Sequence, residues 1–220
     1  PIILHIIKKY HRMGTENFVI ATGYKYNIIN DFFKTKSINF QKIDKNSYLF
    51  NLKIKNQIIE IKTIYTGQKT LTGTRILRLK KHIQSKRFFL TYGDGLSDVN
   101  LKKLLSFHYK NKKIATVTSV RPPVRFGELK IKNNSVVSFK EKPQLNDGWI
   151  NGGFFIFENT FFEMIDKKNN VMLERQPLEN LTRKRSLAAF KHKGFWQCMD
   201  TIRDYEILKK LNKKNAPWKK

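Results

Sequence analysis

The chain has 220 residues, with 44 Lys and Arg against 17 Asp and Glu, which gives a formal net charge of +27 at pH 7. This length suits one α/β domain with a substantial core, and the single cysteine, Cys198, excludes an internal disulfide and a cysteine-cluster metal site. The lysines are scattered along every segment, so the charge predicts a solvated surface and no specific nucleic-acid binding. No apolar run is long enough to cross a bilayer and no signal peptide is visible, so we expect no membrane insertion and a cytoplasmic location.

Helical and β-rich patterns alternate along the first half of the chain. Apolar periodicity predicts helices at residues 1–10, 27–33 and 99–109, and strands at residues 16–22, 47–54, 58–65, 88–92 and 114–120. The 47–54 and 58–65 strands read as an inserted antiparallel pair, and the 88–92 strand reads as a buried parallel strand. The alternation of the remaining elements predicts a mainly parallel sheet with helices on both faces.

The pattern changes from Arg121, because Pro122 and Pro123 interrupt the chain. A hairpin is predicted at residues 128–131 and 136–142, turning at Asn133 and Asn134. The last elements are a strand at residues 149–158, helices around residues 174–185 and 202–211, and a strand near residues 187–191. No internal repeat and no linker-like composition divides the chain, so we expect a single domain over residues 1–220.

Two aspartates are candidate metal ligands. Asp94 lies between Gly93 and Gly95 at the end of an apolar run, where open α/β sheets bind ligands and where glycines let a ligand approach the backbone. Asp200 follows a second apolar stretch and precedes a predicted helix. Each aspartate could instead cap the helix that follows it. If the fold pairs them across a cleft, they complete a two-carboxylate Mg²⁺ site of the kind that nucleotidyl transfer requires.

The segment Thr66-Gly67-Gln68-Lys69-Thr70-Leu71-Thr72-Gly73-Thr74-Arg75 supplies hydroxyls, backbone amides and a guanidinium ahead of a helix. These groups suit a polyphosphate or the edge of a base. A helix capped by Thr72 or Thr74 explains the same residues and is compatible with that role.

Two further motifs suit a sugar phosphate. In Glu141-Lys142-Pro143, the carboxylate could accept a sugar hydroxyl and the ammonium could bind a phosphate, although a surface ion pair before a turn explains the tripeptide almost as well. In Asn151-Gly152-Gly153, the glycines could let the backbone lie against a sugar ring, and a β-bulge is the alternative.

These motifs occur in a defined order together with Pro122-Pro123, Arg125-Phe126-Gly127, the stretch from Glu174 to Leu178, and Ala216-Pro217-Trp218-Lys219. In that order they closely resemble the bacterial glucose-1-phosphate cytidylyltransferases, which are sugar-nucleotide pyrophosphorylases. The resemblance covers nearly the whole chain. It implies a Rossmann-like, GT-A-like nucleotidyltransferase fold of the α/β class, with a mixed sheet flanked by helices and with residues 121–220 as the sugar-phosphate-binding half.

The resemblance also implies an activity and roles for individual residues. CTP and α-D-glucose 1-phosphate would give CDP-glucose and pyrophosphate, for deoxysugar and surface-polysaccharide synthesis, with Mg²⁺ as cofactor and with homo-oligomers as the family expectation. The implied catalytic residues are Asp94, Lys142 and Asp200, of which Asp94 and Asp200 hold the metal. Nucleotide-binding positions would be Thr70, Arg75 and Gly93, and sugar-phosphate-binding positions would be Glu141, Lys142, Asn151 and Gly152.

Members of this family carry a glycine-rich Gly-Thr-Arg loop and a Lys-Pro ahead of the first helix, and Pro1 aligns with the end of that region. We therefore expect the first sheet strand and this loop to lie outside the sequence, and the 220-residue chain by itself to be weakly active. Three alternatives stay open. The nucleotide could be UTP, dTTP or GTP, the chain could be a non-catalytic remnant that binds sugar phosphate, or it could be a basic nucleic-acid-binding protein, which the motif order does not support.

Overall fold

A computed structural model describes residues 1–122, 128–140 and 148–219 of the chain. The helices are α1 (Ile2–His11), α2 (Tyr26–Lys36), α3 (Thr72–Arg78), α4 (Leu101–Asn111), α5 (Gln176–Arg183) and α6 (Ile202–Lys214), with short 3-10 turns η1 (Lys80–His82), η2 (Asn159–Met164) and η3 (Pro217–Lys219). The strands are β1 (Asn17–Thr22), β2 (Asn39–Lys42), β3 (Tyr48–Ile54), β4 (Gln57–Tyr65), β5 (Arg87–Thr91), β6 (Gly95–Ser97), β7 (Ala115–Val120), β8 (Glu128–Lys132), β9 (Ser135–Lys140), β10 (Ile150–Glu158), β11 (Leu187–His192) and β12 (Trp196–Cys198).

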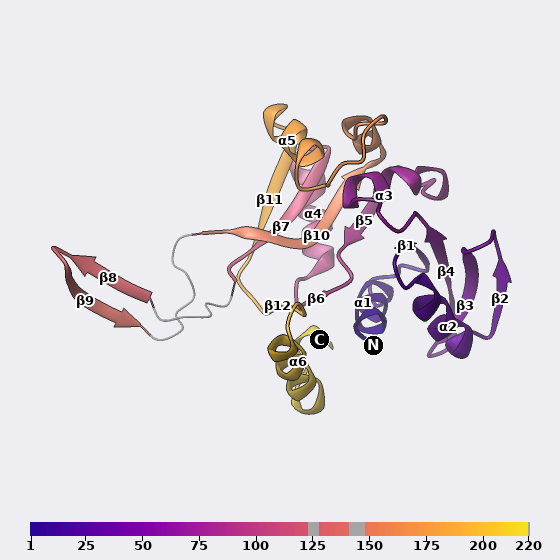
Figure 1. Cartoon of the computed structure of the whole chain (residues 1–220), viewed down its shortest axis with the longest axis horizontal. Helices are drawn as coiled ribbons and strands as arrows, with labels where there is room; N and C mark the ends of the chain where they lie inside the picture. The colour runs from indigo at the N-terminus through magenta and orange to yellow at the C-terminus, as the bar shows by residue number, and fades with distance from the viewer. Residues whose placement is uncertain (123–127, 141–147, 220) are drawn as a thin grey trace.

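The described strands form two four-stranded sheets and two ribbons (Figure 1). One sheet has the order β1-β4-β3-β2, in which β1 and β4 are parallel and the other pairs are antiparallel. The other has the order β11-β7-β10-β5, in which only β11 and β7 are parallel. The ribbons are β6–β12 and the β8–β9 hairpin, which extends away from the rest of the described chain.

The fold class is confirmed as a mixed α/β arrangement, but the expectation of a mainly parallel sheet is wrong. β10 returns between β7 and β5 and pairs antiparallel with both. The predicted buried parallel strand is β5, which is half-buried at every residue and whose described partner, β10, is antiparallel. Its apolar run therefore reflects packing on both faces of an outer strand, which periodicity alone does not separate from central pairing.

Successive residues of β10 face two different cores. Phe154 and Ile156 pack in a cluster with α1, α4 and α6, whereas Phe155 and Phe157 pack in a cluster with α3 and α5. All four side chains are at most 1% exposed, and full burial of such a side chain contributes about 1.5–3 kcal/mol. Because side chains of a strand alternate between its faces, this burial confirms helices on both faces of the β11-β7-β10-β5 sheet.

Helix α1 lies between the two sheets. Its Ile6 and Tyr10 belong to the core beneath β10, while Ile7 packs with Phe33 and Phe50 over the β1-β4-β3-β2 sheet. Ile6 and Ile7 are adjacent and therefore point in directions about 100° apart around the helix, so different sides of α1 are buried in the two cores. Helix α1 therefore packs against both sheets.

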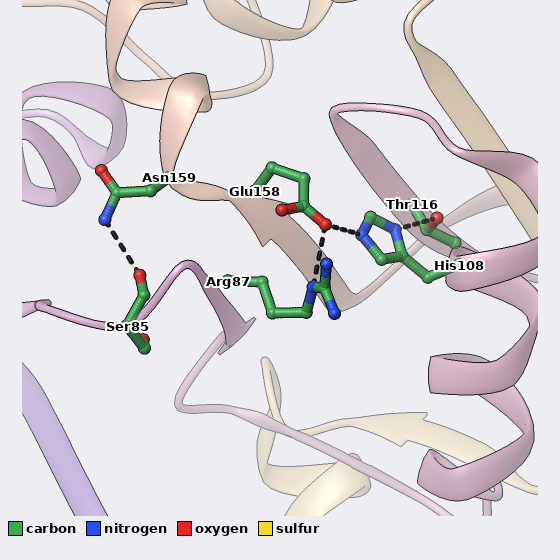
Figure 2. A network of polar contacts seen from close by, with 6 residues as sticks. All are labelled: Ser85, Arg87, His108, Thr116, Glu158 and Asn159. Atoms are coloured by element: carbon green, nitrogen blue, oxygen red, sulfur yellow. Dashed lines mark hydrogen bonds and ion pairs between the residues drawn. The ribbon is translucent and has the colours of Figure 1, made fainter.

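A polar network joins β5, β10 and α4 (Figure 2). It lies at the end of β5 opposite to the end that leads to Asp94. Glu158 Oε1 accepts a 2.8 Å hydrogen bond from Arg87 Nε and lies 3.0 Å from Nε2 of the buried His108. The other ring nitrogen of His108 lies 2.8 Å from Thr116 Oγ1. Partial burial of the Glu158 carboxyl acts to raise its pKa, but the bonds to Arg87 and His108 outweigh burial and hold the pKa below its usual value.

Most predicted elements are confirmed with shifted ends, including the hairpin, whose turn residues Asn133 and Asn134 have φ values of 47° and 65°. Three strands were missed: β2, β6 and β12. The last two are only three residues long, which is too short for a period-2 pattern to be visible. None of the described helices is both long and apolar enough to cross a membrane.

Candidate active site

The β6–β12 ribbon brings the two candidate metal ligands together. Asp94 directly precedes β6, and Asp200 follows β12 by two residues. Gly95 pairs with Cys198 in antiparallel register, and the Met199 amide donates a 2.9 Å hydrogen bond to the Asp94 carbonyl oxygen. The backbones of two segments about a hundred residues apart are thus fixed side by side at the point where both carboxylates emerge.

Neither aspartate caps a helix. The N-cap of α4 is Asn100, whose side chain accepts a 2.9 Å hydrogen bond from the Lys103 amide. The N-cap of α6 is Thr201, which forms a capping box with Asp204. The alternative that Asp94 and Asp200 cap the following helices is therefore wrong, and their carboxylates are not used as helix caps.

The two carboxylates affect one another electrostatically. Partial burial, and then the negative charge of Asp200, raise the pKa of Asp94. Burial first and Asp200 second also raise the pKa of the Cys198 thiol to about 11, so this cysteine is protonated at neutral pH. Two carboxylates that repel one another are suited to a divalent cation, which cancels the repulsion.

The donor set is small. Among the residues that the structure describes, no group of three or more His, Cys, Asp or Glu could hold a metal ion. Asp94 and Asp200 would therefore supply two oxygens, and the remaining ligands would come from water and substrate phosphates, as is usual for Mg²⁺ at nucleotide sites. The chemistry of these residues fits a divalent metal that binds together with a phosphate substrate.

The loop that carries Asp200 is held by buried polar groups. Gln197 Nε2 donates a 2.9 Å hydrogen bond to Asp204 Oδ1, and Asp204 Oδ2 accepts from the Thr201 amide at 3.0 Å. Gln197 and Asp204 are 7% and 4% exposed. Sequence reasoning singled out the stretch around Asp200 but missed this role of Gln197, because its partner lies on the following helix.

Asn151, Gly152 and Gly153 form a β-bulge, as the alternative reading expected, because the register of β10 on β7 shifts between Asn151 and Phe155. Gly153 has φ of 75°, and a Cβ on Gly152 would lie 2.8 Å from Val120 Cγ1. The glycines are thus explained by backbone geometry and packing.

The bulge is hydrogen-bonded to Tyr92, which follows β5, and to Trp196 of β12. Asn151 Oδ1 accepts a 2.8 Å bond from the Gly153 amide, and Asn151 Nδ2 donates a 3.0 Å bond to the hydroxyl of Tyr92, two residues before Asp94. The Gly152 carbonyl accepts a 2.8 Å bond from Trp196 Nε1. Tyr92 and Trp196 were not among the predicted site residues, although both lie inside motifs that the sequence pointed to.

The segment predicted to bind nucleotide leads into α3, but the predicted caps are wrong. The N-cap of α3 is Leu71, and it makes no side-chain cap. Thr72 Oγ1 accepts from the Leu173 amide at 2.8 Å, and Thr74 Oγ1 accepts from the Val171 amide, also at 2.8 Å. Both hydroxyls therefore bond to the segment that precedes α5, rather than to the first turn of their own helix.

Arg75 organises the loop ahead of α3. Its Nη1 donates to the Thr22 carbonyl at 3.0 Å and to the Thr66 hydroxyl at 2.7 Å, and its Nη2 donates to the Gln68 carbonyl at 3.3 Å. Burial, followed by the nearby Arg78, lowers its pKa. The structure thus ties Arg75 to the end of β1 and to residues 66–68.

Thr70 is held by the same group of bonds. Its hydroxyl donates to the Thr66 carbonyl at 2.5 Å and accepts from Arg78 Nη1 at 2.9 Å. Arg78 is a second cation beside the loop that sequence reasoning missed. The two arginines therefore place positive charge beneath this loop, which suits phosphate binding.

Gly93 is exposed, and a Cβ built there would meet nothing within 4 Å. Packing among the described residues therefore does not explain the glycine next to Asp94. Glu141 and Lys142 lie outside the described residues, as do Arg125-Phe126-Gly127. The described site brings together Asp94, Asp200, Asn151 and Gly152.

This geometry agrees with the comparisons with known proteins. A sequence profile of the nucleotidyl transferase family matches residues 1–213. The chain belongs to the nucleotidyl transferase family. It is similar to the glucose-1-phosphate cytidylyltransferase of Salmonella typhimurium, with 36% identity over 224 residues that cover 100% of this chain and 87% of the relative. It is equally similar to the probable glucose-1-phosphate cytidylyltransferase of Bacillus subtilis, with 36% identity over 222 residues, 100% of this chain and 87% of the relative.

A comparison with solved structures supports the fold. HddC from Yersinia pseudotuberculosis, in complex with GMP-PN, matches with a TM-score of 0.66 over 94% of this chain and 83% of that protein. The identity is 19%, so this likeness concerns the fold alone. As a nucleotidyl transferase, the chain is an enzyme of the class that moves nucleotidyl groups.

Proposed function

We propose that this nucleotidyl transferase moves a cytidylyl group from CTP to α-D-glucose 1-phosphate, which gives CDP-glucose and pyrophosphate. The structural observation that carries the proposal is that Asp94 and Asp200 flank the same end of the β6–β12 ribbon, whose Trp196 is hydrogen-bonded to Gly152 of the bulge. The choice of CTP and glucose 1-phosphate rests on the 36% identity, over the whole chain, to relatives that bear those names.

The chemistry asks this chain to hold two anions close together. An oxygen of the sugar phosphate attacks the α-phosphorus of the nucleotide in line with the departing pyrophosphate, and no covalent enzyme intermediate is needed. Asp94 and Asp200 would hold Mg²⁺, which neutralises charge on the phosphates when it is bound. Correct placement of both reactants can itself contribute roughly 7–11 kcal/mol to lowering the barrier.

We assign the remaining site residues by the half of the chain in which they lie. The loop with Thr70 and Arg75, together with Gly93, would bind the nucleotide, and residues 121–220 would bind the sugar phosphate. In that half, Lys142 would meet the phosphate, while Glu141, Asn151 and Gly152 would lie near the glucose. The bonds at Arg75 favour a supporting role in which it shapes the loop for the triphosphate.

The proposal is tested by incubating the chain with glucose 1-phosphate, Mg²⁺ and CTP, UTP, dTTP or GTP in separate reactions, and by measuring sugar nucleotide and pyrophosphate. We expect CDP-glucose to be the main product, EDTA to abolish it, and Asp94→Asn to reduce it by roughly 10²–10³-fold. A preference for UTP, dTTP or GTP would show that CTP is not the nucleotide substrate. Glucose 1-phosphate binding without turnover with any of the four nucleotides, even when a glycine-rich Gly-Thr-Arg loop and a Lys-Pro are added ahead of Pro1, would contradict an enzymatic role.

A further inference from the structure

Glu174 lies between the two halves of the proposed substrate site. Its Oε2 accepts a 2.9 Å hydrogen bond from the Thr72 hydroxyl, at the start of α3. Its Oε1 accepts a hydrogen bond from the Tyr92 hydroxyl, next to the metal-site aspartate Asp94. One carboxylate thus holds a residue of the nucleotide loop and a residue of the sugar side.

The hydrogen bonds around Tyr92 have only one consistent direction. A carboxylate only accepts, so Tyr92 must donate to Glu174, and its hydroxyl oxygen is left to accept from Asn151 Nδ2 at 3.0 Å. The Gly153 amide can only donate, so it fixes Oδ1 of Asn151 as the acceptor, at 2.8 Å. The orientation of the Asn151 amide is therefore determined at both ends, and among the described residues one Nδ2 hydrogen has no acceptor, so it can bind a ligand.

The segment that carries Glu174 is fastened to the nucleotide loop along its length. The Asn170 side chain accepts from the Leu71 amide at 2.8 Å and donates to the Lys69 carbonyl at 3.0 Å. Three residues after Asn170, the Leu173 amide donates to the Thr72 hydroxyl at 2.8 Å. Glu174 is therefore placed by a series of bonds between residues 69–74 and 169–174, and a change at either segment moves its carboxylate.

We propose that Glu174 is a positioning residue for the sugar phosphate. It orients Asn151 through the hydrogen bond from Tyr92, and its own position is held relative to the nucleotide loop by the hydrogen bond from Thr72. This inference rests on the proposed function, in which Asn151 binds glucose 1-phosphate. Glu174 touches neither substrate in this account. It acts by keeping the free Nδ2 hydrogen of Asn151 directed to the ligand, and by excluding the flipped amide.

The experiment compares Glu174→Gln, Tyr92→Phe and the double variant by steady-state kinetics. Glutamine offers one acceptor oxygen and one donor nitrogen, so it cannot accept from both hydroxyls. We expect the KM for glucose 1-phosphate to rise roughly 3- to 30-fold in Glu174→Gln, which corresponds to the loss of about one or two hydrogen bonds. The KM for CTP should stay within about twofold of its value in the unsubstituted chain. Since Glu174 acts through Tyr92, the double variant should be no worse than Tyr92→Phe.

Glu179→Gln is the matched control, because Glu179 is an exposed carboxylate on the neighbouring helix α5. A readout besides activity is the side-chain amide resonance of Asn151 in ¹⁵N spectra. It should shift in Glu174→Gln and Tyr92→Phe and stay in place in Glu179→Gln.

Three results would overturn the inference: additive effects in the double variant, an equal rise in the two KM values, or a lower melting temperature with an unchanged KM and an unshifted Asn151 resonance. Failure of the proposed function has a different signature. If the unsubstituted chain binds glucose 1-phosphate without turnover, calorimetric dissociation constants replace the KM values and the same comparison applies. If the chain does not bind glucose 1-phosphate at all, both proposals are wrong.

Discussion

The indole Nε1 of Trp196 donates a 2.8 Å hydrogen bond to the carbonyl oxygen of Gly152. Trp196 lies on β12, four residues before Asp200, and Gly152 lies in the bulge of β10. This bond joins the ribbon that carries the two aspartates to the strand that carries the proposed sugar-binding residues. Together with the hydrogen bond from Asn151 to Tyr92, this bond sets the spacing between the proposed metal site and the proposed sugar site.

Trp196→Phe removes the donor and keeps most of the ring. The Gly152 carbonyl loses its indole partner, so we expect a loss of about 1–2 kcal/mol in the free energy of unfolding. We also expect kcat to fall about 3- to 10-fold, because the bulge and the aspartates lose their fixed spacing. Urea denaturation and steady-state kinetics measure the two effects, and unchanged kinetics in a stably folded variant would contradict the role in spacing.

Thr201→Ala should weaken metal binding through the backbone of Asp200. The Thr201 side chain accepts from the Asp204 amide, and loss of such a cap costs about 1 kcal/mol of stability. We expect Mn²⁺ affinity, measured by electron paramagnetic resonance, to fall several-fold. Asn100→Ala removes the cap of α4 and is the matched control, since it should lose similar stability without any change in Mn²⁺ affinity.

The buried Lys9 should make stability rise with pH. Burial, opposed by the charge of Asp98, lowers its pKa to about 8, and the side chain is 9% exposed. Below pH 8 the ammonium is charged in both states, so the folded chain bears the full cost of burial. Between pH 8 and about 10.5 only the unfolded chain keeps the proton, so this cost disappears as pH rises.

Lys9→Met should therefore be more stable than the unsubstituted chain by up to roughly 3 kcal/mol at pH 7, and the difference should shrink by pH 10. Denaturant unfolding at pH 7, 8.5 and 10 measures this trend. Lys8→Met changes an exposed lysine of the same helix and should show no such convergence. A constant difference for Lys9→Met across this range would refute the assignment.

The Glu158 network also makes stability rise with pH, but in the acidic range. The folded-state pKa of Glu158 is lowered, so the carboxylate contributes stability above its unfolded pKa and loses it as the pH falls through the folded value. With its side chain 22% exposed, we expect Glu158→Gln to cost about 1–2 kcal/mol at pH 7, and the cost to shrink progressively as the pH falls below the ordinary pKa of a glutamate. The exposed Glu163, which pairs with Lys80 and Lys167, provides a control substitution that should have little effect.

Several features could be predicted from the sequence because their cause is local. Apolar periodicity located the helices and most strands, and Asn133-Asn134 fixed the hairpin turn, since these residues tolerate positive φ. Asp94 was recognisable from its flanking glycines at a strand end. The bulge at residues 151–153 was also foreseen as an alternative, because two adjacent glycines inside a strand pattern mark a break in pairing.

The partners of these elements were decided only by the tertiary structure. Periodicity shows which residues of a strand share a face, but it does not show which strand lies alongside, so the antiparallel pairing of β5 with β10 was missed. In the same way, the hydroxyls of Thr72 and Thr74 read as helix caps but bond to a segment about a hundred residues away.

Residue types and their order were enough to predict the fold class and the family resemblance, and to select the two aspartates as candidates. Only the tertiary structure decided that β6 and β12 pair, and that Trp196, Gln197, Tyr92 and Glu174 support the site. The physical reason is that a hydrogen bond between distant segments depends on distance and direction in space, which no local pattern of residues records.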